Sequence, residues 1–205
     1  MFSLLLRGFV LGFAVAASPG PIFFLCLRRT LTQGRLIGLA SGLGVATADG
    51  FYAAIATFGV AALTAAFVAG RRPLAVIGGL VLVLLAVRIL MERRSVAEPA
   101  PVSARSVAWA YASTLGLTIT NPATIVSFAA LAATLGFGTG GYAVWPALVV
   151  LGVLLGSAAW WCILVAGASL LRSRVTPAVV RWISTVSGLA IAALGILAVI
   201  SAFSG

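Results

Sequence analysis

The sequence predicts an all-α polytopic membrane protein with six transmembrane helices that form two inverted three-helix repeats. Three observations lead to this fold class. Of the 205 residues, 62% are hydrophobic and only 8% are charged, whereas about 25% of the residues in a soluble protein are charged. The apolar residues gather in long runs that are separated by arginine-containing connections. The first and fourth runs are each interrupted by a proline that follows a polar residue.

Six apolar runs are expected to be helices, at about residues 4–27, 36–67, 74–91, 105–135, 143–171 and 179–203. They are too long for barrel strands, and only a helix satisfies its own backbone groups within a bilayer. A spanning helix needs about 20 residues, so the longer runs must tilt, kink or project. The first run resembles a signal peptide, but its apolar character continues from Ile22 to Leu27, so we expect a retained helix.

The arginines predict the orientation of the chain. The connections between runs 1 and 2, 3 and 4, and 5 and 6 hold Arg28, Arg29, Arg35, Arg93, Arg94, Arg105, Arg172, Arg174 and Arg181. The opposite side holds Arg7, Arg71 and Arg72. Arginine-rich loops are cytoplasmic, so these three connections are expected in the cytoplasm, with the chain in a bacterial inner membrane. Because the arginines flank apolar runs, we expect the bilayer, and no nucleic acid, as their partner.

The chain is expected to divide into two repeats at its polar linker. Residues 92–104 contain charged residues and prolines, and they separate a first repeat, 1–91, from a second, 105–205. Three spans are an odd number, so the second repeat begins on the opposite side of the membrane. Inverted repeats of this kind are common in secondary transporters, which alternate access by rocking one part against another.

The two proline breaks predict paired half-helices. Ser18-Pro19-Gly20-Pro21 interrupts the first run and Asn121-Pro122 the fourth. A serine or asparagine before proline starts a helix, because its side chain caps the first amides. Pro19 is nine residues before Arg28, about 14 Å along a helix and so near the bilayer midplane. Two half-helix N-termini there would suit a carboxylate. The alternative is a pair of ordinary proline kinks.

Asp49 is the only acid in any of the six runs. A lone ionisable residue at membrane depth is costly and indicates function. It is expected to bind a substrate ammonium group, to carry a proton, or to do both; the alternative is a structural carboxylate bonded to a neighbouring hydroxyl. Tyr52, one turn later, is placed on its face. In the fourth run, a spacing of four and three places Thr114, Thr118 and Asn121 on one face, which either lines a polar path or bonds to backbone carbonyls.

Small residues recur at every fourth position of the second run, and they indicate close helix packing. They are Gly34, Gly38, Gly42, Ala46, Gly50 and Ala54, with a similar Gly152-x-x-x-Gly156 in the fifth run. These stripes also permit a homodimer. Trp160 and Trp161 lie within the fifth run, where they either pack in the core or line a pocket.

Metal and redox chemistry are not expected. The chain has no histidine, and its two cysteines, Cys26 and Cys162, lie inside apolar runs without a CxxC motif. We interpret both as buried small hydrophobes. No cofactor, metal site or enzymatic activity is therefore expected.

The stretch GFVLGFAVAASPGPIFFLCLRRTLTQGRLIGLASGLGVATADGFYAAIATFG, residues 8–59, resembles the N-terminal half of the lysine exporter (LysE/RhtB) family of amino-acid exporters. The shared features are Pro19-Gly20-Pro21, Gly34 with Gly38, Asp49, and Asn121-Pro122 in the fourth run. Ile22 is a departure, since many members have a polar residue there. The resemblance implies export of amino acids or close relatives, driven by the proton gradient as an antiport.

Three classes of function remain. The first is a secondary exporter in which residues 18–21 and 121–122 hold a substrate carboxylate, and Asp49 meets the ammonium group or a counter-moving proton. The second is a membrane carrier of electrons between thiols, which needs a cysteine at each break. The third is a passive channel or a metal-ion transporter, for which one intramembrane acid and no histidine supply few ligands.

Overall fold

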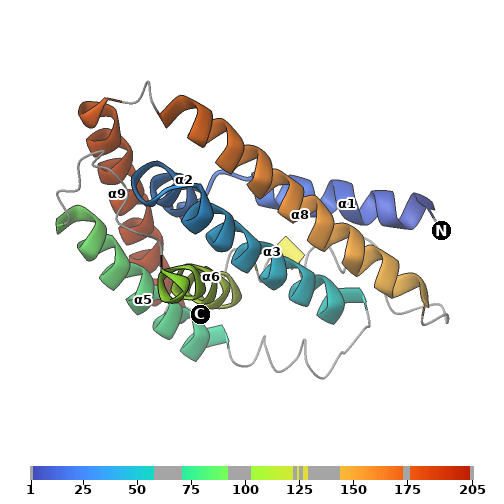
Figure 1. The fold of residues 1–205 in the computed structure, drawn as a ribbon. Coiled ribbons are helices and arrows are strands. Elements are labelled where there is room, and N and C mark those ends of the chain that lie inside the picture. The colour runs from blue at the N-terminus through green and yellow to red at the C-terminus, as the bar shows by residue number, and fades with distance from the viewer. Residues whose placement is uncertain are drawn as a thin grey trace.

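The protein is all-helical in the computed structural model, which describes residues 2–57, 71–91, 103–121, 124, 127–128, 144–172 and 176–203 (Figure 1). The helices are α1 (Phe2–Ala17), α2 (Pro21–Gln33), α3 (Arg35–Thr57), α5 (Arg71–Met91), α6 (Ala104–Ile119), α8 (Val144–Leu171) and α9 (Pro177–Phe203). The predicted helical parts 58–67 and 129–135 lie outside the described residues.

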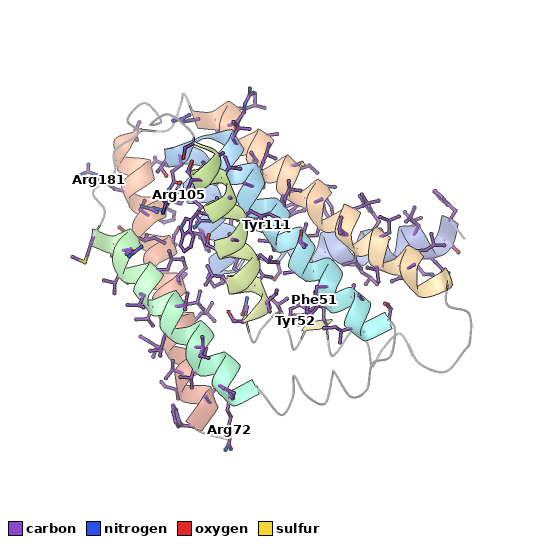
Figure 2. All side chains as sticks on the ribbon, turned by 60° about the horizontal axis from the view of Figure 1, so that its bottom comes forward. Phe51, Tyr52, Arg72, Arg105, Tyr111 and Arg181 are labelled. Atoms are coloured by element: carbon purple, nitrogen blue, oxygen red, sulfur yellow. The ribbon has the colours of Figure 1, made fainter. Side chains whose placement is uncertain are left out.

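Several helices are long and apolar enough to cross a membrane. Within the described ranges, three pass on length and composition, in α3, α8 and α9, and α1 with α2 together form a bent fourth candidate. The apolar part of α5, Val76–Met91, is shorter. Figure 2 shows Arg105 and Arg181 toward one end of the bundle and Arg72 at the other. This separation matches the prediction, which placed Arg105 and Arg181 on one side of the membrane and Arg72 on the other.

The packing pairs follow a pattern that relates the two halves of the chain. α1 packs along α8, α6 packs along α3, α3 packs along α8, and α5 packs along α9. In the order of the chain, α1 corresponds to α6, α3 to α8 and α5 to α9. When corresponding helices are exchanged, the α1·α8 pair becomes the α6·α3 pair, while the α3·α8 and α5·α9 pairs stay the same. This is what an inverted repeat requires. The division into repeats at 1–91 and 105–205 stays a prediction.

Glycines bring helices into backbone contact at two seams. Between α1 and α8, a Cβ added at Gly12 would overlap the Val153 carbonyl, and one added at Gly156 would overlap the Phe9 carbonyl. Gly79 of α5 meets the backbone of Gly195 of α9 in the same way. Such close approach maximises dispersion contacts where lipid offers no hydrophobic driving force. The predicted packing role of Gly152-x-x-x-Gly156 is therefore confirmed.

The first span is broken as predicted, but its second helix begins later. α1 ends at Ala17, and α2 begins at Pro21 after a bend of 78°. Gly20 is the N-cap, with an extended φ of −145°, and no side chain caps the helix. The prediction that Ser18 caps a helix starting at Pro19 is wrong. Pro21 disfavours helical geometry at Gly20, so the helix starts only at Pro21, where a missing amide costs little.

The boundary between the first two runs also differs from the prediction. α2 continues to Gln33, so Arg28 and Arg29 are helical and only 4% and 7% exposed. Their burial is possible because hydroxyl and carbonyl groups of neighbouring helices accept their hydrogen bonds, as described below for Arg29. The reversal falls at Gly34, whose φ of +95° favours glycine. Gly34 is thus a turn residue and not the first member of the α3 packing stripe.

Candidate functional site

A cavity of about 220 Å³ lies at the break between α1 and α2. Its walls come from the end of α1, the break itself, the start of α2 and the middle of α3. The middle of α8, the end of α6 and Leu194 of α9 complete them. The lining residues with polar side chains are Ser18, Asp49, Thr118, Asn121, Thr124, Ser127 and Trp161. Drug-sized ligands occupy about 300–1,000 Å³, so this volume favours a smaller solute.

Asp49 is held between α3 and α8 at the wall of this cavity. Its side chain is 2% exposed, and its Oδ2 accepts a hydrogen bond of 2.7 Å from the hydroxyl of Ser157, which is fully buried. No arginine forms an ion pair with Asp49 in the part of the chain that the structure describes. A buried carboxylate charge without a cation is costly. A proton or a cationic ligand group would offset that cost.

The first turn of α2 faces the same cavity. Pro21, Ile22 and Phe23 all line it. The first amides of a helix have no partner within it, and the first amide available here is that of Ile22, because proline has none. The aligned peptide dipoles add roughly half a positive charge at this end. The backbone, rather than the side chain at position 22, therefore supplies the donors for an anion.

The end of α6 supplies the opposite wall. α6 ends at Ile119, Thr120 caps it, and the amide of Asn121 donates to the Thr118 carbonyl at 3.2 Å. The Thr118 hydroxyl donates to the Thr114 carbonyl at 2.8 Å, which leaves its oxygen able to accept. Thr114 instead bonds to backbone carbonyls and lies outside the cavity. Two roles were predicted for this polar face, lining a polar path and bonding to backbone carbonyls. Thr118 does both, and Thr114 only bonds to backbone carbonyls among the described residues.

Trp161 of α8 completes the wall near Asp49. It is 3% exposed, and its indole Nε1 has no hydrogen-bond partner among the described residues. Buried donors of this kind are normally paired with protein or water. A carboxylate, a carbonyl or a water molecule in the cavity would satisfy it.

A family model described as LysE type translocator matches residues 13–202. The chain belongs to the LysE type translocator family. The match spans the break, Asp49 and the end of α6, so all parts of the cavity lie within it. No curated protein and no solved structure matches this translocator.

The cavity of the translocator brings together most of the residues that the sequence singled out. Ser18, Pro19, Gly20, Pro21, Asp49, Thr118 and Asn121 all line it. Pro122 lies outside the described residues, so a helix start there stays a prediction, although Thr124, Ser127 and Phe128 are helical.

Tyr52 is not among the lining residues. Its hydroxyl donates to the carbonyl of Ile119, and its ring stacks on Phe128 with centroids 5.7 Å apart. Figure 2 shows Tyr52 near the end of α6. Tyr52 therefore supports the end of α6, which forms a wall of the cavity, but does not itself line the cavity.

The sequence reasoning missed Ser157 and left Trp161 undecided. Ser157 donates to Asp49 from a helix that is otherwise apolar around it. A single hydroxyl in the middle of such a helix was the available signal. Nothing in the spacing indicated which residue of α3 would lie opposite.

Proposed function

We propose that this translocator is a secondary exporter of amino acids or related small zwitterionic metabolites, and that a proton moves in the opposite direction. The observation that carries the proposal is the cavity itself. It places the buried carboxylate of Asp49, which pairs with no arginine among the described residues, in one small space with the N-terminal turn of α2. A zwitterion presents the two opposite charges that such a pair would bind.

The substrate carboxylate would accept hydrogen bonds from the first amides of α2, where the helix dipole favours an anion. Trp161 and Asn121 would supply further polar contacts at the same wall. The ammonium group would lie at Asp49 and balance its charge. Because a proton balances the same charge, substrate and proton would compete for Asp49, and that competition is the basis of antiport.

The thiol-carrier alternative lacks its reactive groups at the break. Cys26 is buried in α2 and Cys162 is exposed on α8, and neither lines the cavity. The metal-transporter alternative lacks ligands, because no cluster of three or more metal-binding side chains occurs among the described residues. Both remain less favoured than the exporter.

The test is amino-acid efflux from bacteria that lack their own exporters and are loaded with a panel of dipeptides. The wild type is compared with Asp49→Asn, which keeps an oxygen able to accept the Ser157 hydrogen bond. Glu98→Gln, the same chemical change in the linker between the two predicted repeats, is the matched control. Fluorescence-detected size exclusion confirms that each protein is folded.

We expect the wild type and Glu98→Gln to accelerate efflux of at least one amino acid. Asp49→Asn and a proton uncoupler should each abolish that gain. Folded wild type that changes no efflux across the panel contradicts the amino-acid assignment. Efflux that survives in Asp49→Asn and remains sensitive to the uncoupler removes Asp49 from the proton path.

A further inference from the structure

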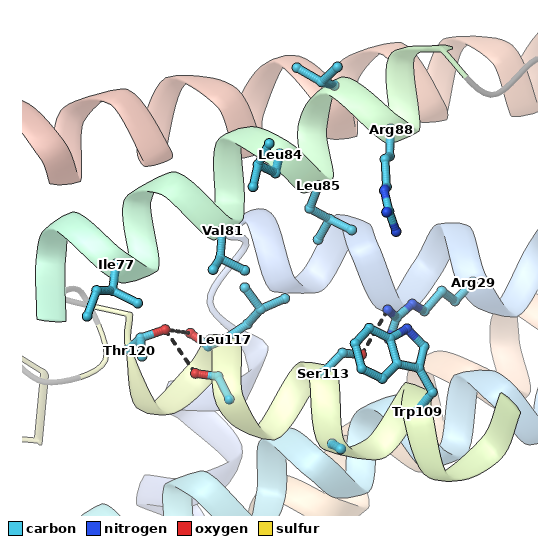
Figure 3. A pocket seen from close by; sticks show the side chains of 13 residues that line it. Arg29, Ile77, Val81, Leu84, Leu85, Arg88, Trp109, Ser113, Leu117 and Thr120 are labelled. Atoms are coloured by element: carbon cyan, nitrogen blue, oxygen red, sulfur yellow. Dashed lines mark hydrogen bonds between the residues drawn. The ribbon is translucent and has the colours of Figure 1, made fainter. Parts of the chain in front are cut away.

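A second and larger cavity, of about 610 Å³, lies between α5 and α6 (Figure 3). It shares no lining residue with the cavity at the α1–α2 break. One wall is the α5 face formed by Ile77, Val81, Leu84, Leu85, Val87 and Arg88. The other is the α6 face formed by Trp109, Ala112, Ser113, Gly116, Leu117 and Thr120, and Arg29 reaches in from α2.

The two faces are available because each helix is packed elsewhere. α5 packs along α9, and α6 packs along α3. Their facing side chains therefore stay exposed, as the values of 66% for Leu84 and 67% for Trp109 show. At Gly116, an added Cβ would meet no atom within 4 Å. The cavity is thus an open groove between α5 and α6.

Two arginines converge at one end of this groove. Arg29 is 93% buried, its exposed fraction being 7%. Among the described residues, its guanidinium donates only to neutral groups: the hydroxyls of Ser41 and Ser113, both at 3.0 Å, and the carbonyl of Ala110, at 3.1 Å. Figure 3 shows the side chain of Arg88 extending from α5 toward Arg29.

No acid pairs with either arginine among the residues that the structure describes, of which Asp49 is the only acidic one. A buried charge is stable only when it is compensated, and two cations that face one another repel. Within the described part of the chain, no anion lies at the arginine end of the groove.

Apart from Thr120, the rest of the groove is apolar, and the groove is elongated. From Arg88 to Ile77 the α5 wall extends for eleven residues, about 16 Å along a helix. Its side chains are aliphatic, and the exposed indole of Trp109 lies at the arginine end (Figure 3). Tryptophan at that position is typical of the membrane interface, where one side of the ring meets headgroups. The groove thus joins an anion-binding end to an acyl-binding length.

We propose that this groove binds an anionic phospholipid, with its phosphate between Arg29 and Arg88 and one acyl chain along Leu84, Val81 and Ile77. The proposal stands on charge complementarity at one end and aliphatic lining at the other. A bound lipid would cover the exposed α5 and α6 faces and place a phosphate between the two arginines. The proposal does not depend on which substrate the translocator carries.

The test is native mass spectrometry of the purified protein titrated with phosphatidylglycerol or phosphatidylcholine of identical acyl chains. Arg88→Gln removes the exposed arginine without disturbing the bonds of Arg29. Gly116→Leu fills the open part of the groove. Arg35→Gln is the matched control, because Arg35 is exposed and does not line the groove. sn-Glycerol phosphate without acyl chains is a separate arm.

We expect phosphatidylglycerol to bind at least tenfold more tightly than phosphatidylcholine. Arg88→Gln should lower its affinity about tenfold, Arg35→Gln should not change it, and Gly116→Leu should weaken binding of both lipids. Equal binding of the two lipids, or equal losses in Arg88→Gln and Arg35→Gln, would overturn the proposal. Glycerol phosphate that binds as tightly as phosphatidylglycerol would also overturn it, by assigning the site to a soluble anion.

A second readout locates the lipid within the molecule. Phosphatidylglycerol with brominated acyl chains should quench tryptophan fluorescence saturably, and Trp109→Phe should remove most of the saturable part. Quenching that is unchanged in Trp109→Phe would place the lipid elsewhere and contradict the groove.

Discussion

The backbone contact between α1 and α8 predicts opposite effects for the same substitution at two positions of one helix. Gly156 of α8 lies at the seam, where an added Cβ would stand 2.8 Å from the carbonyl carbon of Phe9 and 2.9 Å from the amide nitrogen of Phe13. Gly167 of the same helix has no atom within 4 Å of an added Cβ. Gly156→Ala and Gly167→Ala therefore make the same chemical change in opposite surroundings.

The expected difference between the two variants follows from two terms. Alanine in place of glycine within a helix stabilises it by about 0.5–1 kcal/mol, and Gly167→Ala should show this gain alone. At Gly156 the gain is opposed by an overpacking cost of about 1–3 kcal/mol or more, because the obstacle is backbone and cannot rotate away. Because the helix gain is common to both variants, their unfolding free energies should differ by the overpacking cost alone, about 1–3 kcal/mol or more.

Thermal unfolding in detergent, followed by intrinsic tryptophan fluorescence, measures this difference. For a chain of 150–250 residues, 1 kcal/mol corresponds to about 2–4 °C in Tm, so the two midpoints should lie about 2–12 °C apart, with Gly156→Ala the lower. Equal midpoints would refute the backbone seam between α1 and α8. A lower midpoint for Gly167→Ala alone would refute it as well.

Three further predictions concern the walls of the α1–α2 cavity. Tyr52→Phe loses the hydrogen bond to Ile119; it should cost about 1 kcal/mol of stability and slow efflux, because the end of α6 loses a support. Ser157→Ala removes the hydroxyl that donates to Asp49 and should slow efflux about tenfold, since a charge-assisted bond contributes about 1.5–3 kcal/mol. Trp161→Phe removes a buried donor that has no partner among the described residues; it should raise the substrate concentration for half-maximal efflux and lower Tm, because the smaller ring underfills a buried site.

Each of these variants has a matched control in the same chain. Tyr111→Phe loses a hydroxyl bond to Thr47 away from the cavity, so it should cost similar stability without slowing efflux. Ser201→Ala loses only a bond within its own helix. Trp160→Phe removes another buried unpartnered Nε1 that does not line the cavity. Efflux changes as large in the controls as in their counterparts would contradict the assignment of the cavity.

Much of the cavity was predictable because proline and acid are rare and costly inside an apolar run. Pro19 and Pro21 indicated the place of the break within a few residues, and the cost of an acid at membrane depth singled out Asp49. Both features report local chemistry, which a single sequence displays directly. Their meeting in one cavity is what the predicted inverted arrangement of two three-run halves would produce.

What the sequence did not predict depends on contacts between distant residues. Arg28 and Arg29 looked like loop residues, because arginine normally flanks an apolar run. Their burial depends on acceptors such as Ser41 and Ser113, which are 12 and 84 residues from Arg29. The start of α2 at Pro21 depends on the conformation that each proline imposes on the residue before it, which the capping pattern of Ser18 obscured.

The α1–α8 seam has a consequence for how the molecule can move. α1 belongs to the first half of the chain and α8 to the second, yet glycines of both hold their backbones together. A motion of residues 1–91 as one block would have to open this seam and the α5–α9 seam as well. Two mixed units, α1 with α8 and α5 with α9, could instead shift past each other with both seams closed. Such units would be joined through α2, the helix that begins at the cavity and ends at Gly34.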